Sequence, residues 1–268
     1  MLNKRIATVA VIIPVSVTFV VIGGWPFFLF ICAILGISTW EYWRMFKQGG
    51  FSPNPSALFA GVLLLAAARN FEGFNHSDWI ITLIILAAMT VHTIMYEQRR
   101  EQSATDFGIT LAGIFYIGWL GSYFLSVRQL PNGLWWLLFL IPVVGIGDAG
   151  AYFIGNKFGK TKMAPKVSPN KTWEGYFGGI LFATIGGVIL ASLWQLKVPV
   201  FNVPQGLLFG LILGVLTPLG DMGESMLKRQ FNLKDTSQLL PGHGGFLDRI
   251  DTWLWSAAIG YYLITWFV

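Results

Sequence analysis

The chain has 268 residues and a formal net charge of +5, and its composition indicates a membrane protein. Hydrophobic residues make up 54% of it and charged residues only 12%, whereas soluble domains carry roughly 25% charged residues. The basic residues fall in short loops between apolar runs, which is typical of membrane topology rather than of a nucleic-acid surface. The single Cys32 excludes an internal disulfide and a thiolate metal cluster.

Apolar segments separated by glycine- and proline-rich turns follow one another along the whole chain. They cover residues 6–22, 27–43, 56–71, 79–96, 107–127, 134–156, 174–195, 205–226 and 252–268. Most of them approach the ~20 residues that a helix needs to cross the hydrocarbon core of a bilayer. We therefore expect an all-α, polytopic integral membrane bundle of about nine transmembrane helices. No internal repeat or linker indicates a second domain, so residues 1–268 are expected to form a single membrane domain.

The basic residues predict the orientation of this bundle. If the N-terminus is cytoplasmic, fifteen of the 18 basic residues fall in cytoplasmic loops. The opposite side then holds only Arg69, Arg128 and Lys197. This distribution satisfies the positive-inside rule, so we expect a cytoplasmic N-terminus and a C-terminus outside. The polar loops then face the cytoplasm, where nucleotides and magnesium are found.

One carboxylate is expected in the middle of the sixth apolar segment. A charged side chain at the bilayer centre costs about 2.5 kcal/mol or more, so Asp148 must face a partner or a wet cavity. Tyr152 lies four residues further on and shares that face of a helix. Gly147 and Gly150 would let another helix approach closely. A structural polar contact inside the bundle is the alternative to a functional role for Asp148.

Four acids flank the polar stretch that joins the eighth and ninth apolar segments. Asp221 and Glu224 close the eighth segment, and Asp248 and Asp251 open the ninth; each pair shares a helix face. Capping explains acids at the start of a helix but not Asp221, which is expected at the C-terminus of a broken or kinked helix. An ion held by Asp221 and Asp248 explains both, and oxygen-only ligands favour a hard cation such as Mg²⁺.

Basic residues and glycines in the same stretch suit a phosphate-bearing ligand. The candidates are Lys228, Arg229, Lys234 and Arg249, with Gly244 and Gly245 beside His243. The cations supply countercharge, and the glycines permit close backbone approach to a phosphate. His243 could be a ligand, a base or a hydrogen-bond donor that stabilises the turn, and residue chemistry leaves these roles open. A basic loop alone is more often a topology signal, but interleaved carboxylates favour a binding site.

A second polar loop, residues 157–173, holds five lysines. Contact with anionic lipid headgroups would explain them. The end of the loop is more specific, because Thr172 can cap a helix whose first turn is acidic. Lys171 then stands at a helix N-terminus, a natural place to hold phosphate, with Ser168 and Asn170 just before it.

The stretch from Ser225 to Asp251 resembles the signature of phosphatidate cytidylyltransferases, also called CDP-diacylglycerol synthases. The residues that carry the resemblance read SxLKRx₄KDxSx₂LPxHGGFxDRID. The stretches SPNKTWEG at 168–175 and GDAGAYFIG at 147–155 are also similar to family features. Residues 1–140 match only as generic membrane helices.

The resemblance implies transfer of the cytidylyl group of CTP to phosphatidate, which gives CDP-diacylglycerol and pyrophosphate in phospholipid biosynthesis. It further implies a homodimer in a bacterial inner (plasma) membrane, with the active site facing the cytoplasm. Mg²⁺ is expected at a paired-cation centre on Asp221 and Asp248, with K⁺ as the candidate second cation. Residues 1–140 are then N-terminal helices, and 141–268 form the catalytic part with cytoplasmic loops 157–173 and 227–251.

Residue roles follow from the same resemblance together with the chemistry. A phosphatidate oxygen would attack the α-phosphorus of CTP in line, which requires no protein nucleophile. The residues expected in catalysis are Asp221, Asp248, Lys228, Arg229 and Asp148. Those expected to bind the nucleotide are Ser168, Asn170, Lys171, Lys234, His243, Gly244, Gly245, Arg249 and Asp251.

Three other functions account for parts of the pattern. CDP-alcohol phosphatidyltransferases use DGx₂ARx₈Gx₃Dx₃D, whereas here Asp248 is followed by Asp251 after only two residues. Polyprenol kinases also bind CTP and a lipid, so residue chemistry does not separate them. An ion-coupled transporter would explain Asp148 and Asp221 within apolar segments. It would not explain the polar loop, and no inverted repeat supports it.

Overall fold

The computed structural model describes residues 2–98, 100–240, 242 and 244–268, and nearly all of its regular structure is helical. The helices are α1 (Leu2–Ile22), α2 (Gly24–Gln48), α3 (Pro55–Glu72), α4 (Ser77–Glu97), α5 (Ser103–Gly113), the π-helix η1 (Ile114–Trp119), α6 (Leu120–Gln129), α7 (Gly133–Phe158), α8 (Trp173–Trp194), α9 (Val203–Leu216), α10 (Pro218–Gln230) and α11 (Leu247–Phe267). The all-α prediction is therefore confirmed, although it did not include the small hairpin of strands β1 (Lys162–Ala164) and β2 (Ser168–Thr172).

The nine expected apolar segments coincide with these helices except at Gln195, Thr217 and Val268. α5, η1 and α6 together cover one segment, and α9 with α10 covers another. Among the described residues, six helical stretches are long and apolar enough to cross a membrane. They are Gly24–Gln48, Ser77–Glu97, Ser103–Gln129, Gly133–Phe158, Trp173–Trp194 and Val203–Gln230. The protein is thus a polytopic helical membrane protein. The count of nine spans and the sides on which the two termini lie stay predictions.

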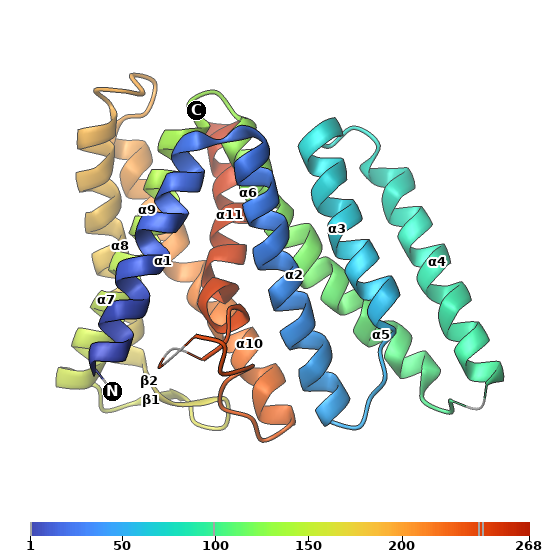
Figure 1. Cartoon of the computed structure of the whole chain (residues 1–268). Coiled ribbons are helices and arrows are strands. Elements are labelled where there is room, and N and C mark those ends of the chain that lie inside the picture. Colours follow the sequence, from blue (N-terminus) through green and yellow to red (C-terminus); the bar gives the residue numbers. More distant parts are fainter. Residues whose placement is uncertain (1, 99, 241, 243) are drawn as a thin grey trace. The chain divides into compact units, whose positions relative to one another are not determined.

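The chain folds into two compact units, and the first combines its N-terminal helices with the polar loop. This unit contains Met1–Ser126 and Phe231–Arg249. Within it α3 packs against α2, α4 and η1, as can be followed in Figure 1. Fully buried apolar side chains such as Leu58, Val62 and Ile117 form the core between these helices.

The second unit contains Val127–Gln230 and Ile250–Val268, and its centre is the packing of α8 against α7 and α9 (Figure 1). Small residues line both faces of α8. A Cβ added to Gly147 of α7 would lie 3.1 Å from the Cβ of Ala183. A Cβ added to Gly187 would lie 2.3 Å from the carbonyl oxygen of Gly206 in α9. The glycines therefore let helix backbones touch, which is a common means of association between membrane helices.

This close packing predicts that Gly187→Ala lowers the thermal stability of the protein. The new methyl group would overlap backbone atoms of α9, and overpacking of this kind costs about 1–3 kcal/mol. Gly36→Ala on α2 is the matched control, because no atom lies within 4 Å of a Cβ placed there. We expect the unfolding midpoint in detergent to fall for Gly187→Ala and to stay or rise slightly for Gly36→Ala. Equal midpoints for both variants would contradict the packing described here.

The expected loop at 157–173 contains the only β-structure of the described residues apart from an isolated bridge. Strands β1 (Lys162–Ala164) and β2 (Ser168–Thr172) pair antiparallel, with Lys162 opposite Thr172 and Ala164 opposite Ser168. The loop expected at 227–251 is shorter than expected at its start, because α10 continues to Gln230 before the chain leaves the helix.

Candidate catalytic site

The break between α9 and α10 places an acid at the start of a polar helix. α9 ends at Leu216 and α10 begins at Pro218. Proline suits the first turn, because the N–H that it lacks would have no partner within the helix there. The expected break is confirmed, but the expectation that Asp221 ends a helix was wrong, because a new helix starts at Pro218. Asp221 lies in the first turn of α10, where the helix dipole favours a negative charge.

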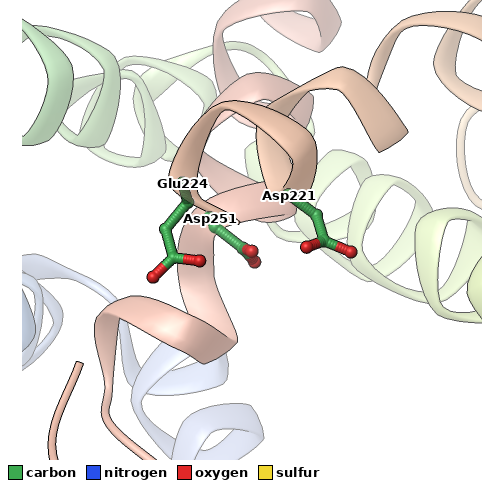
Figure 2. A group of neighbouring side chains, drawn as sticks. All are labelled: Asp221, Glu224 and Asp251. Carbon is green, nitrogen blue, oxygen red and sulfur yellow. The ribbon is translucent and has the colours of Figure 1, made fainter. Parts of the chain in front are cut away.

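Three carboxylates from α10 and α11 lie close together, as Figure 2 shows. Asp221, Glu224 and Asp251 each offer one oxygen, and these oxygens lie within 4.8 Å of one another. Glu224 and Asp251 are buried, at 0% and 5% exposure. The helices approach closely at Gly220, where a Cβ would lie 2.9 Å from the backbone oxygen of Asp251. We call these three residues the acid cluster.

Two lysines offset part of the negative charge of the acid cluster. The ammonium group of Lys228 lies 2.5 Å from Oε2 of Glu224, one turn back along α10, and both side chains are buried. The ammonium group of Lys171 lies 2.8 Å from Oδ2 of Asp221 and donates a hydrogen bond to the carbonyl oxygen of Pro218 at 3.4 Å. With three carboxylates against two ammonium groups, the site keeps a negative charge when all of these groups are ionised.

Asp251, which precedes the apolar segment 252–268, lies in surroundings that disfavour the charged form of its carboxyl group. Burial raises the pKa of its carboxyl group to about 7, and repulsion from Asp221 adds to the rise. The backbone N–H of Thr252, the charge of Lys228 and the Thr252 hydroxyl all lower this pKa, but they do not offset burial. A bound cation would stabilise the ionised form. Since the donors are all carboxylate oxygens, the cluster fits a hard divalent cation.

The β1–β2 hairpin and the start of α8 position Lys171. Thr172 is the N-cap of α8, and its Oγ1 accepts a hydrogen bond from the N–H of Gly175 at 3.2 Å. The carboxylate of Glu174 in the first turn accepts a hydrogen bond from the N–H of Thr161 at 3.1 Å. The predicted cap with an acidic first turn is therefore confirmed. Lys171 immediately precedes the cap, as expected, and its side chain contacts Asp221.

Arg229 connects the hairpin to α10. Its Nε donates a hydrogen bond to the carbonyl oxygen of Val167 at 3.1 Å, between the two strands. Ser168 and Asn170 follow on β2, where Ser168 is half-buried and Asn170 is exposed. The hairpin, α10 and α11 therefore bring together residues that are far apart in sequence. Their roles in binding a nucleotide stay predictions.

The polar loop after α10 is folded by its own acid, Asp248. One oxygen, Oδ2, accepts hydrogen bonds from the N–H of Thr236 at 2.9 Å, from the Thr236 hydroxyl at 2.9 Å and from the N–H of Gly245 at 2.8 Å. Leu240 donates its N–H to the carbonyl oxygen of Gly244 at 2.9 Å. Gly244 has a φ of +83°, and a Cβ there would lie 2.9 Å from Asp248 Oδ2. Both the backbone conformation and the space therefore favour glycine.

Other predicted residues lie at exposed positions. Lys234 and Arg249 are exposed, while Gly245 is buried. Asp148 and Tyr152 are exposed on α7. The catalytic role of Asp148 stays a prediction. His243 lies outside the described residues.

The two acids expected to hold one cation belong to different units of the chain. Asp221 belongs to the second unit and Asp248 to the first, so their pairing around a cation stays a prediction. Glu224 joins the acid cluster, although sequence reasoning noted only that it shares a face with Asp221.

Glu41 on α2 was missed entirely. It is fully buried and accepts hydrogen bonds from the polar loop. Its position inside the apolar segment 27–43 could have indicated a functional or structural role, because an acid within such a segment needs a partner or a wet cavity, as for Asp148.

A polytopic membrane protein with a buried acid cluster beside two lysines has the construction of an enzyme that acts on phosphate-bearing substrates. The chain matches the sequence model of the cytidylyltransferase family over residues 3–267, and it belongs to that family. The match covers the N-terminal helices as well as the polar loops.

Curated relatives are similar over nearly their whole length. The phosphatidate cytidylyltransferase of Bacillus subtilis is 35% identical over 270 residues, which cover 99% of this chain and 98% of the relative. The enzyme of that name from Pseudomonas aeruginosa is 32% identical, with 94% and 93% covered. The one from Synechocystis sp. is 29% identical, with 98% and 96% covered.

Proposed function

We propose that this chain is a phosphatidate cytidylyltransferase, which makes CDP-diacylglycerol and pyrophosphate from CTP and phosphatidate. The observation that carries the proposal is the similarity to relatives of that name over nearly the full length of both chains. The acid cluster with its two lysines supports it, because two substrates that both carry phosphate groups must meet despite their like charges.

The reaction needs positioning and charge stabilisation more than covalent chemistry from the protein. An oxygen of the phosphatidate phosphate forms a bond to the α-phosphorus of CTP, and the bond from that phosphorus to the oxygen bridging to the β-phosphorus breaks. Pyrophosphate carries away the electron pair of the broken bond. Phosphatidate is already an anion at neutral pH, so it needs no protein base to attack. Lys171, Lys228 and Arg229 are suited to hold phosphate oxygens in line.

We infer that Asp221, Glu224 and Asp251 hold the catalytic divalent cation, with Mg²⁺ as the expected ion. When bound, Mg²⁺ would offset negative charge on the nucleotide phosphates. Asp248 remains a candidate ligand from the family resemblance, and K⁺ remains the candidate second cation. In the first unit, Lys234, Gly244, Gly245 and Arg249 belong to the polar loop, which we infer binds CTP.

The setting of the enzyme follows from its charges and its relatives. We infer an inner (plasma) membrane protein with about nine spans, a cytoplasmic N-terminus and a C-terminus outside. The active site then faces the cytoplasm, where CTP is available. The expected assembly is a homodimer, and the single membrane domain and the catalytic part at 141–268 are retained as proposals.

The proposal predicts a defined product from the purified chain. In detergent with CTP, phosphatidate and Mg²⁺, we expect CDP-diacylglycerol and pyrophosphate in equal amounts, measured by lipid chromatography and a pyrophosphate assay. Replacing phosphatidate by a polyprenol should give no phosphorylated lipid and no CDP. A folded protein that leaves phosphatidate unchanged, or that phosphorylates the polyprenol, would contradict the proposal.

A further inference from the structure

Glu41 accepts four hydrogen bonds from residues that lie 195 to 206 positions further along the chain. Its Oε1 accepts from the Ser237 hydroxyl at 2.6 Å and from the N–H of Phe246 at 2.9 Å. Its Oε2 accepts from the N–H of Leu247 at 2.7 Å and from the Thr236 hydroxyl at 3.2 Å. The side chain has 0% exposure. Burial of a carboxylate is costly unless hydrogen bonds compensate for the lost water, and here donors serve both oxygens.

The four donors come from the two ends of the polar loop. Thr236 and Ser237 lie near its start, and Phe246 and Leu247 lie where α11 begins. The first N–H groups of a helix have no partner within the helix. Glu41 therefore caps α11 from a different helix, where the dipole also favours a negative charge.

Gly245 packs tightly against this carboxylate and against Thr236. A Cβ added to Gly245 would lie 2.2 Å from Oγ1 of Thr236 and 2.6 Å from both carboxylate oxygens of Glu41. The single hydroxyl proton of Thr236 is shared between the two acids, because Oγ1 lies 3.2 Å from Oε2 of Glu41 and 2.9 Å from Oδ2 of Asp248. Glu41 from outside the loop and Asp248 from within it thus hold the same backbone turn.

We propose that Glu41 is a positioning residue for the polar loop. It holds the loop at four residues, Thr236, Ser237, Phe246 and Leu247, and through them it sets where Gly244, Gly245 and Arg249 meet the nucleotide. Glu41 does not need to touch a substrate for this role. The contact with the loop stands on geometry alone. That the positioned loop binds CTP rests on the proposed function.

Hydrogen exchange tests the contact directly. In the full chain in detergent, Glu41→Gln should speed exchange of the amides at 246 and 247 at least tenfold, because a glutamine presents one acceptor and an NH₂ group that faces existing donors. Ser38→Ala is the matched control on α2. Its side chain is also fully buried, its hydroxyl has no hydrogen-bond partner in the described structure, and exchange in the loop should not change.

Kinetics test the consequence for the reaction. Loss of a supporting residue of this kind typically costs about tenfold to a hundredfold in activity. For Glu41→Gln we expect most of that loss as a raised KM for CTP, with a smaller change in the KM for phosphatidate. Ser237→Ala, which removes one of the four hydrogen bonds, should shift both exchange and KM for CTP in the same direction by less. Because Ser237 and Glu41 act together, the double variant should be no worse than Glu41→Gln alone.

Unchanged loop exchange in both Glu41→Gln and Ser237→Ala would overturn the proposal. So would an equal loss of activity toward both substrates with normal exchange at 246 and 247. Should Glu41→Gln fail to fold, Ser237→Ala alone decides, because it leaves three hydrogen bonds in place. If the wild-type chain makes no CDP-diacylglycerol, the proposed function fails, while the exchange experiment still decides whether Glu41 holds the loop.

Discussion

Asp221→Asn and Asp251→Asn are each expected to lower turnover by about a hundredfold or more while leaving the protein folded. Each change removes one carboxylate from a cluster whose oxygens lie within 4.8 Å of one another. A neutral amide is a poorer ligand for a hard cation, and charge stabilisation of this kind contributes several kcal/mol, at about 1.4 kcal/mol per tenfold in rate. Initial rates with CTP and phosphatidate over a range of Mg²⁺ concentrations measure the effect, and more Mg²⁺ should partly restore activity.

Asp78→Asn provides the control for loss of a single acid, because Asp78 is exposed in the first turn of α4. Its activity should stay within about twofold of the wild type, as expected for an isolated surface charge. The same Mg²⁺ titration separates the roles of Asp248. If Asp248 is a ligand, Asp248→Asn raises the Mg²⁺ requirement; if it only folds the loop, KM for CTP rises at an unchanged Mg²⁺ requirement. Near-normal rates for Asp221→Asn or Asp251→Asn would refute the assignment of the acid cluster.

The fold was accessible from the sequence because the bilayer limits the possible structures. Backbone groups in hydrocarbon must pair within their own segment, so long apolar runs become helices. All nine expected segments are helical for this reason, apart from three single residues at helix ends or at the break between α9 and α10. The number that cross the membrane does not follow as directly. α3 has 18 residues and α11 has 21, but neither is among the six stretches that are both long enough and apolar enough to cross a membrane.

The candidate site was only partly accessible, and the reason differs from residue to residue. Lys171 could be found because a cap and an acidic first turn are local signals that fix a helix start. Asp221 was assigned to the wrong end of a helix, since a proline can end one helix and begin the next. The sequence pattern does not distinguish a proline that ends a helix from one that begins a helix. The structure shows that a new helix begins at Pro218.

Contacts between distant segments were the least accessible part. Nothing near Glu41 in the sequence indicates that its partners are Ser237 and Leu247, because such pairing is decided by tertiary packing. The general rule that an acid in an apolar segment must have a partner does apply to it. The same rule singled out Asp148, which is exposed on α7. The rule identifies residues that need an explanation, but it does not identify their partners.

Lys228→Met is expected to lower both thermal stability and turnover. A double variant that also replaces Glu224 should recover stability but not turnover. Lys228 and Glu224 form an ion pair one turn apart on α10, with side-chain exposures of 9% and 0%. Removing one partner of a buried pair leaves an uncompensated charge and costs about 3–5 kcal/mol. The double variant Lys228→Met with Glu224→Gln removes that charge, so the unfolding midpoint should recover most of its loss. Turnover should stay at least about a hundredfold low, because the phosphate-binding cation and one cluster carboxylate are both gone.

Thermal unfolding in detergent and CDP-diacylglycerol formation, measured on the same preparations, distinguish the structural role of the pair from its chemical role. Lys197→Met is the control, since Lys197 is exposed in the connection between α8 and α9, and it should match the wild type in both measurements. Recovery of turnover together with the midpoint would show that the pair only stabilises α10, and Lys228 would then lose its place among the phosphate-binding residues. A low midpoint that persists in the double variant would instead show that the buried charge of Glu224 was not the cause of the instability, because no uncompensated carboxylate would remain at that position.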